Sequence, residues 1–173
     1  MPLTGLAIAA QVAQQRITIN PFLPSQLEPN SYAVRLADRG MMYADATLDI
    51  RTKPTTVAFH IPASGYCLTP GRLYLAQTME TIGSAHFAMT LDAQAAVSAL
   101  GMWIQLSAPL GHVGAIIPWT LEIAVVQPVI VYPGMPIGKV AFWLPVGALA
   151  PYRGRYAGSL GVVASKLAEG ELG

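Results

Sequence analysis

The chain has 173 residues and a formal net charge of +1, with 11% charged and 53% hydrophobic residues. An ordinary soluble domain carries about 25% charged residues, so we expect part of the surface to be buried between subunits. The length suits one domain, residues 1–173. Nucleic acid is not expected as a partner, because its recognition requires clustered Lys and Arg side chains and the three lysines lie far apart in the sequence.

Cysteine content and hydropathy exclude further classes. Cys67 is the only cysteine, so the chain can form neither an intrachain disulfide nor a thiolate zinc cluster. Residues 1–15 lack the basic start and the continuous apolar stretch of a signal peptide. The most apolar region, residues 113–131, is interrupted by two prolines, a glutamate and a glutamine. Neither a membrane span nor a metal site is therefore expected.

The chain begins with a predicted helix at residues 6–15, within an N-terminal lead-in of residues 1–20, and continues as short strands. The predicted strands are residues 31–36, 47–51, 56–61, 71–78, 102–107, 119–126, 129–132 and 139–144. Many short strands with turn signals at close spacing indicate an all-β sandwich or barrel. The glycine-rich end, residues 151–173, is expected to form an arm outside the core.

One short helix is predicted inside the strand pattern, at residues 92–101. Asp92 is a suitable N-cap, the middle is rich in alanine, and Gly101 stands where helices often end in a left-handed residue. These signals together predict two helical turns.

Several segments, taken in order, resemble the dCTP deaminase/dUTPase family, most closely its dCTP deaminase branch. They are RITINPF (16–22), QLEPNSY (26–32), LTPGRLYLAQTME (68–80), WTLEI (119–123), YPGMPIG (132–138) and RYAGSLG (155–161). The resemblance covers nearly the whole chain. It implies a distorted jelly-roll of the dUTPase-like type, a homotrimer with nucleotide sites between subunits, and deamination that uses no zinc.

Glu122 matches the family's catalytic glutamate, which activates a water molecule for attack on the cytosine ring. Thr120 and Ala124 lie on its face of the strand, and a carboxylate in such an apolar strand is costly unless it is used or paired. Glu122 is thus a general base, or a member of an ion pair, or exposed at a subunit boundary. Ala108 matches a position whose backbone carbonyl helps to hold the water.

Four further residues match positions near the family's site. His112 replaces an aspartate and is either a new base, since imidazole titrates near neutrality, or a hydrogen-bonded loop residue. In the tail, Arg155 matches a lysine that contacts phosphate, and Tyr156 keeps the residue beside it. Ser159 replaces a glutamine that reads the edge of the base.

The phosphate-binding helix departs from the family pattern. Where the family has Gly-Arg-Ser-Ser, this chain has Ala93-Gln94-Ala95-Ala96, and a further family arginine falls on Ala99. About three polar or charge-assisted contacts are lost, each worth roughly 1–3 kcal/mol. Triphosphate binding should therefore be weaker by a factor on the order of 100 or more.

From this loss we expect a non-catalytic homotrimer with a structural role in a larger protein assembly, such as a virus particle, or a regulatory role. The alternative is a deoxynucleotide-metabolising enzyme that acts through Glu122, either a metal-independent cytosine-nucleotide deaminase or a dUTPase-like enzyme with altered phosphate recognition. The expected location is the cytoplasm, or the virion for a particle component. No cofactor is expected, except Mg²⁺ accompanying a bound nucleoside triphosphate.

Overall fold

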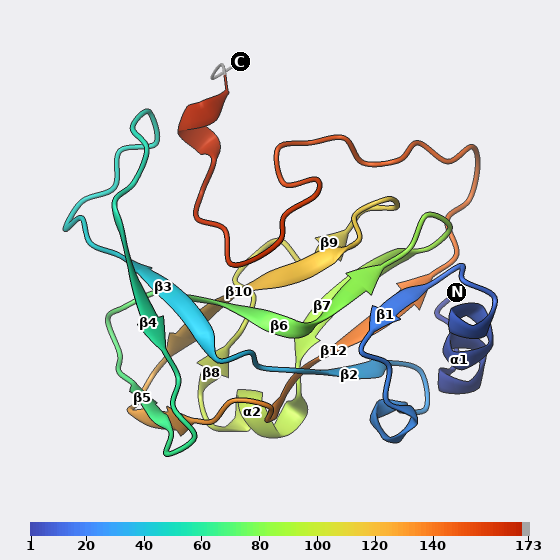
Figure 1. The fold of residues 1–173 in the computed structure, drawn as a ribbon, viewed down its shortest axis with the longest axis horizontal. Coiled ribbons are helices and arrows are strands. Elements are labelled where there is room, and N and C mark those ends of the chain that lie inside the picture. The colour runs from blue at the N-terminus through green and yellow to red at the C-terminus, as the bar shows by residue number, and fades with distance from the viewer. Residues whose placement is uncertain (171–173) are drawn as a thin grey trace.

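The computed structural model describes residues 1–170, in which short strands dominate and two short α-helices occur (Figure 1). The helices are α1 (Gly5–Ala13) and α2 (Ala95–Ala99), with 3₁₀ turns at Pro24–Gln26 and Leu167–Glu169. The strands are β1 (Thr18–Asn20), β2 (Tyr32–Arg35), β3 (Arg39–Tyr43), β4 (Thr56–His60), β5 (Tyr66–Leu68), β6 (Tyr74–Gly83), β7 (Ala88–Ala93), β8 (Met102–Trp103), β9 (Leu110–Gly111), β10 (Ile117–Val125), β11 (Val129–Val131) and β12 (Pro136–Trp143). The expected all-β class is confirmed.

The strands form two larger antiparallel sheets and one small one. The first has the order β4-β3-β6-β10-β8, with β1 also paired to β6, and the second has the order β2-β12-β7-β9. The pair β11-β5 is separate. The central contact of the first sheet is the β6–β10 pair, in which Leu75 lies opposite Glu122. This pair therefore sets the position of the candidate catalytic glutamate.

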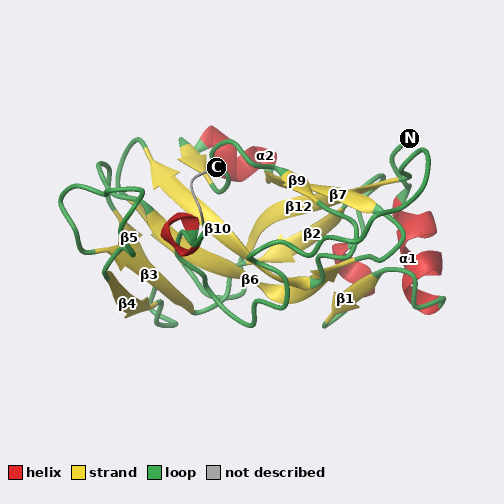
Figure 2. Cartoon of the chain, turned by 90° about the horizontal axis from the view of Figure 1, so that it is seen from above, coloured by secondary structure: helices red, strands yellow, loops and turns green. Residues whose placement is uncertain are grey.

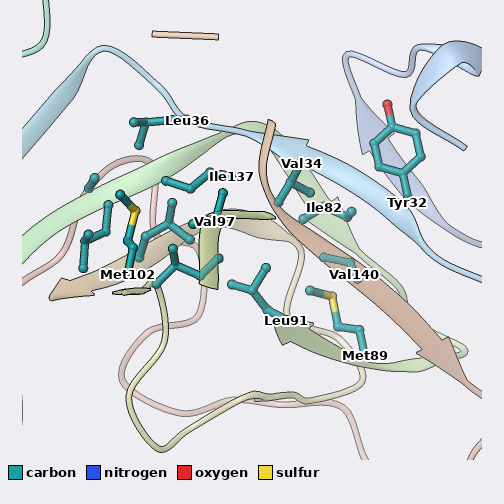
Figure 3. Packing of buried hydrophobic residues seen from close by; sticks show 14 of the residues in the cluster. Tyr32, Val34, Leu36, Ile82, Met89, Leu91, Val97, Met102, Ile137 and Val140 are labelled. Atoms are coloured by element: carbon teal, nitrogen blue, oxygen red, sulfur yellow. The ribbon is translucent and has the colours of Figure 1, made fainter. Parts of the chain in front are cut away.

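The core consists of alternate residues of strands from both large sheets. In β12, Val140 and Phe142 are fully buried while their neighbours are more exposed, as expected where side chains alternate between two faces. Figure 3 shows Val140 in one cluster with Leu91 of β7 and Ile82 of β6. Burial of these side chains on both sheets holds the layers together.

Helix α1 lies at the opposite end of the molecule from β4 and β5 (Figures 1 and 2). Thr4 caps it by accepting a hydrogen bond from the N–H of Ala7 at 3.3 Å. The helix ends before Gln15, which has a φ of 58°. It corresponds to the helix predicted at residues 6–15. None of the described helices is long and apolar enough to cross a membrane.

The prediction of a strand at residues 47–51 is wrong, because this segment forms a turn. The carboxylate of Asp49 accepts hydrogen bonds from the backbone and the guanidinium of Arg51, at 2.9 Å from the backbone nitrogen. The hydrogen bond from the Arg51 side chain, with that from its backbone, lowers the pKa of Asp49. An acceptor so close in sequence competes with ladder hydrogen bonds and favours the turn.

The start of the internal helix also differs from the prediction. Asp92 is not its N-cap but a residue of β7, opposite Lys139 of β12, so the ladder continues past the expected boundary. Gln94 takes the N-cap position without a side-chain capping bond. The expected end is confirmed, since Gly101 has a φ of +75° and donates its N–H to the carbonyl of Ser98 at 2.9 Å.

The C-terminal arm returns along the chain's own sheet, as Figure 1 shows for the segment that crosses above β10. Its backbone N–H groups are bound at two strands: Val163 donates to Oγ1 of Thr120 at 3.1 Å and Ser165 to the hydroxyl of Tyr43 at 3.0 Å. The arm is therefore anchored to β10 and β3. Residues 171–173 of the predicted arm lie outside the described residues.

Candidate active site

A cavity of about 440 Å³ lies between β10, the loops on either side of β9, and the returning arm. Its size falls within the range of about 300–1,000 Å³ that is typical of small-molecule sites. The residues that line it include Tyr43 of β3, Leu75 of β6, and Thr120 and Glu122 of β10. The cavity is the place where separate strands and the arm converge, so it can enclose a ligand on several sides.

Glu122 presents its carboxylate in this cavity because of strand alternation. Leu121 and Ile123 are buried in the core, while Glu122 and Thr120 lie on the other face and line the cavity, as predicted from the sequence. Its Oε2 accepts a hydrogen bond from the N–H of Leu106 at 3.2 Å. Across residues 1–170 no Lys, Arg or His nitrogen lies within ion-pair distance of it. The carboxylate is thus held by one backbone donor, with no ion pair to explain its place.

Most of the site residues predicted from the sequence lie around this one cavity. The lining includes Glu122, Ala108, His112, Tyr156 and Ser159. They come from a strand, two loops and the tail, so the fold brings together residues that are up to about fifty positions apart in the chain. Their roles in binding or catalysis stay predictions.

The imidazole of His112 stacks on the ring of Tyr152, with centroids 5.3 Å apart and an interplanar angle of 13°. The N–H of Tyr152 donates to the carbonyl of Val113 at 2.8 Å, which fixes the start of the arm beside the loop. The hydroxyl of Tyr152 accepts a hydrogen bond from the N–H of Tyr156 at 3.4 Å. The arm thus holds His112 at the edge of the cavity through an aromatic pair.

Arg155 is not among the residues that line the cavity. Its Nη1 donates to the carbonyls of Lys166 at 2.9 Å and Leu167 at 3.4 Å. In return, Nζ of Lys166 donates to the carbonyl of Arg155 at 2.8 Å. The side chains of Arg155 and Lys166 therefore bind each other's backbone, and the phosphate contact expected of Arg155 stays a prediction.

Sequence reasoning missed several residues that shape the cavity, above all Trp119. The β6–β10 register shifts between Pro118 and Thr120, so Trp119 occupies an irregular position that can redirect its side chain. Its indole Nε1 donates to the carbonyl of Ile82 at 2.9 Å, and its N–H donates to Oγ1 of Thr78 at the same distance. The neighbouring Pro118 was the sequence signal of an interrupted ladder.

Helix α2 does not contribute to the cavity within one chain. Gln94 donates from Nε2 to Oε1 of Glu28 at 2.8 Å and to the carbonyl of Gly138 at 3.3 Å, so its amide joins the helix to other parts of the fold. Ala95, Ala96 and Ala99 offer no polar side-chain atoms. Residues 1–170 contain no group of three or more His, Cys, Asp or Glu side chains that could hold a metal ion.

Comparison with known proteins places this fold and site in a family. The family described as "dCTP deaminase-like" matches residues 2–144. The chain is 34% identical over 168 residues to the "dCTP deaminase, dUMP-forming" of Cytophaga hutchinsonii, with 96% of each chain covered. It is 35% identical over 152 residues to the protein of the same name from Hathewaya histolytica, covering 87% of this chain and 88% of that one.

The fold is also similar to a solved structure, the 2′-deoxycytidine 5′-triphosphate deaminase from Agrobacterium tumefaciens. The TM-score is 0.66 at 19% sequence identity, and the match covers 83% of this chain and 48% of the other. This chain therefore spans about half the length of that protein. At such low identity the likeness supports the fold alone.

These relatives overturn the expectation of a non-catalytic protein with a structural or regulatory role. Proteins about one-third identical over most of the chain are named as enzymes, and none of them is named as a virus-particle component. The expectation failed because it rested on α2, where polar side chains are absent, whereas the cavity that contains Glu122 is a separate feature of this chain. With the family match, the identity and the fold in agreement, the chain belongs to the dCTP deaminase-like family.

Proposed function

We propose that this protein is a hydrolytic deaminase of the cytosine ring in a deoxycytidine compound, with Glu122 as the general base. The observation that carries the proposal is the position of Glu122, whose carboxylate lines a cavity of about 440 Å³ and is held by the Leu106 N–H without an ion pair among residues 1–170. The names of the relatives support the same reaction class.

In this proposal the carboxylate of Glu122 accepts a proton from water while the water oxygen bonds to C4 of the cytosine ring. The resulting tetrahedral carbon carries both the new hydroxyl and the amino group. The C4–N bond then breaks as Glu122 delivers its proton to the leaving nitrogen, and the proton of the C4 hydroxyl moves to ring N3 as that hydroxyl becomes the uracil carbonyl. One water is consumed and one ammonia is released, so the reaction needs no redox partner. Proton transfer of this kind contributes about 10²–10⁴-fold to a rate.

Other residues of the cavity have supporting roles in this proposal. The backbone carbonyl of Ala108, a residue of the cavity lining, accepts a hydrogen bond from the attacking water in this proposal. His112, fixed by its stack on Tyr152, forms part of the wall near the base, with Tyr156 and Ser159 contributed by the arm. Mg²⁺ would enter only with a bound triphosphate.

The working form is proposed to be a homotrimer in the cytoplasm. Large apolar side chains that are about half exposed in the single chain support association, among them Trp103, Val126 and Ile130. Light scattering coupled to gel filtration measures the mass directly: three times 18.3 kDa is expected, and a monomer at micromolar concentration would contradict the trimer.

The proposed reaction is tested by incubating the purified chain with deoxycytidine, dCMP and dCTP in water enriched in heavy oxygen. The expected products are ammonia and, in equal amount, a uracil compound that carries one heavy oxygen on its ring. If dCTP is used, analysis of its product for dUMP and pyrophosphate shows whether the phosphate chain is also cleaved. Absence of ammonia with all three compounds would overturn the proposed function.

A further inference from the structure

The cavity that contains Glu122 is lined without any Lys or Arg side chain, counting every lining residue in the described part of the chain. Glu122 is the one acidic residue of this lining and His112 is its one histidine. A polyphosphate placed here would meet a carboxylate and, from the described part of this chain, no guanidinium or ammonium group. Sites for phosphate chains ordinarily supply several charge-assisted contacts, which are the strong kind of hydrogen bond.

Two cations of the arm, Arg155 and Lys166, are bound to the backbone and do not line the cavity. Arg155 and Lys166 bind each other's backbone carbonyls, and Nζ of Lys166 lies 5.8 Å from the centre of the ring of Tyr156. Releasing either side chain toward a ligand would break contacts that hold the arm closed. In this closed arrangement of the arm, Arg155 and Lys166 are therefore engaged with the backbone and do not offer their charges to a phosphate in the cavity.

The polar groups that do line the cavity are mainly neutral hydroxyls. The hydroxyl oxygens of Tyr43, Thr120 and Tyr156 accept hydrogen bonds from the backbone of the arm, at 3.0–3.1 Å. Each of these hydroxyls keeps its own O–H as a donor. Neutral donors around an apolar wall suit a sugar and a base, which carry neutral hydroxyl, carbonyl and ring nitrogen groups.

We infer that the substrate of this site is a deoxycytidine compound without a polyphosphate, namely the nucleoside or its monophosphate, and that dCTP is disfavoured. This inference rests on the proposed function and narrows its substrate. A phosphate chain that forms two charge-assisted contacts fewer is bound about 100-fold more weakly. The relatives are named for dCTP, so the substrate preference would separate this chain from them.

The test compares kcat/KM for ammonia release from deoxycytidine, dCMP and dCTP with the full chain, with and without Mg²⁺. The expected result is a value for deoxycytidine, dCMP or both that exceeds the value for dCTP by about 100-fold. A dCTP value equal to or above the other two would overturn the inference but keep the proposed function, and would mean that another copy of the chain brings a cation to the site. No turnover of any compound would overturn both.

A gain-of-function variant gives a second readout that does not depend on loss of folding. Ala95→Ser, Ala96→Ser and Ala99→Arg together place two hydroxyls and a guanidinium on the exposed face of α2, outside the cavity of the same chain. We expect α2 of another copy to approach the cavity, so that this variant raises kcat/KM for dCTP at least tenfold and changes the value for deoxycytidine much less. No change for dCTP, or equal changes for both compounds, would contradict phosphate discrimination as the cause of the preference.

Discussion

The Glu80→Gln substitution tests whether a buried ion pair holds β2 against β6. Glu80 has no exposed surface, and its carboxylate accepts hydrogen bonds from Nε of Arg35 at 2.8 Å, from the N–H of Arg35 at 2.9 Å and from Nε2 of Gln26 at 3.2 Å. The side chain of Arg35 is only 19% exposed. The substitution keeps the shape of the side chain but leaves the guanidinium without its counter-charge.

Loss of one partner from a buried pair costs about 3–5 kcal/mol, because the remaining charge stays desolvated. We expect a decrease of this size in the free energy of unfolding, measured by urea denaturation followed by tryptophan fluorescence. Protein concentration must be held constant because association with other copies adds to apparent stability. The fraction that is folded should bind ligand as the parent does, since Glu80 lies outside the cavity lining.

A matched control is available in the exposed pair of Asp49 and Arg51. Its side chains are 43% and 73% exposed, so Asp49→Asn should leave the unfolding midpoint unchanged within error. If Glu80→Gln were as mild as Asp49→Asn, the assignment of a stabilising role to the buried pair would be refuted.

Three further outcomes are expected. Thr120→Val removes the acceptor for the Val163 N–H and should cost about 0.5–1.5 kcal/mol of local stability, seen as faster hydrogen exchange at Val163; unchanged exchange would show that the arm is held elsewhere. Gly83→Ala would bring a side chain against the backbone of Ala115 and should lower stability by about 1–3 kcal/mol, whereas Gly161→Ala meets only an ordinary contact and should match the parent in thermal unfolding. His112→Ala removes the stack on Tyr152 and should loosen the arm by about 0.5–1.5 kcal/mol, measured by hydrogen exchange at Tyr152; equal exchange in both proteins would refute this.

Alternating apolar residues and turn residues predicted much of the fold. The strands that were not predicted have local causes. The strand around Glu122 was found because large apolar residues recur at every second position from Leu121 to Val125. β3 was missed because its arginine, glycine and two methionines carry no β-branched signal. β7 was overlooked because Asp92 was assigned to the following helix, although pairing with β12 extends the strand past it. Ladder hydrogen bonds across the sheet outweighed a local capping preference.

The sequence predicted several residues of the cavity but not the function. Resemblance named Glu122, Ala108 and His112, and the fold places all three around one cavity. Tyr43 could not have been found, since it ends a strand that was not predicted and its place depends on a contact with the arm. The expectation of a non-catalytic protein was wrong because it treated α2 and Glu122 as one unit. In a single chain Glu122 lines the cavity and α2 does not.

The central claim is that Glu122 is the base that activates water in this cavity. The most direct measurement is kcat for ammonia release by Glu122→Gln beside Glu169→Gln, a matched change at an exposed carboxylate outside the cavity. We expect Glu122→Gln to lose about 10²–10⁴-fold while its thermal unfolding stays near that of the parent, and Glu169→Gln to retain full activity. A Glu122→Gln protein that is folded and releases ammonia at the parent rate would contradict the claim.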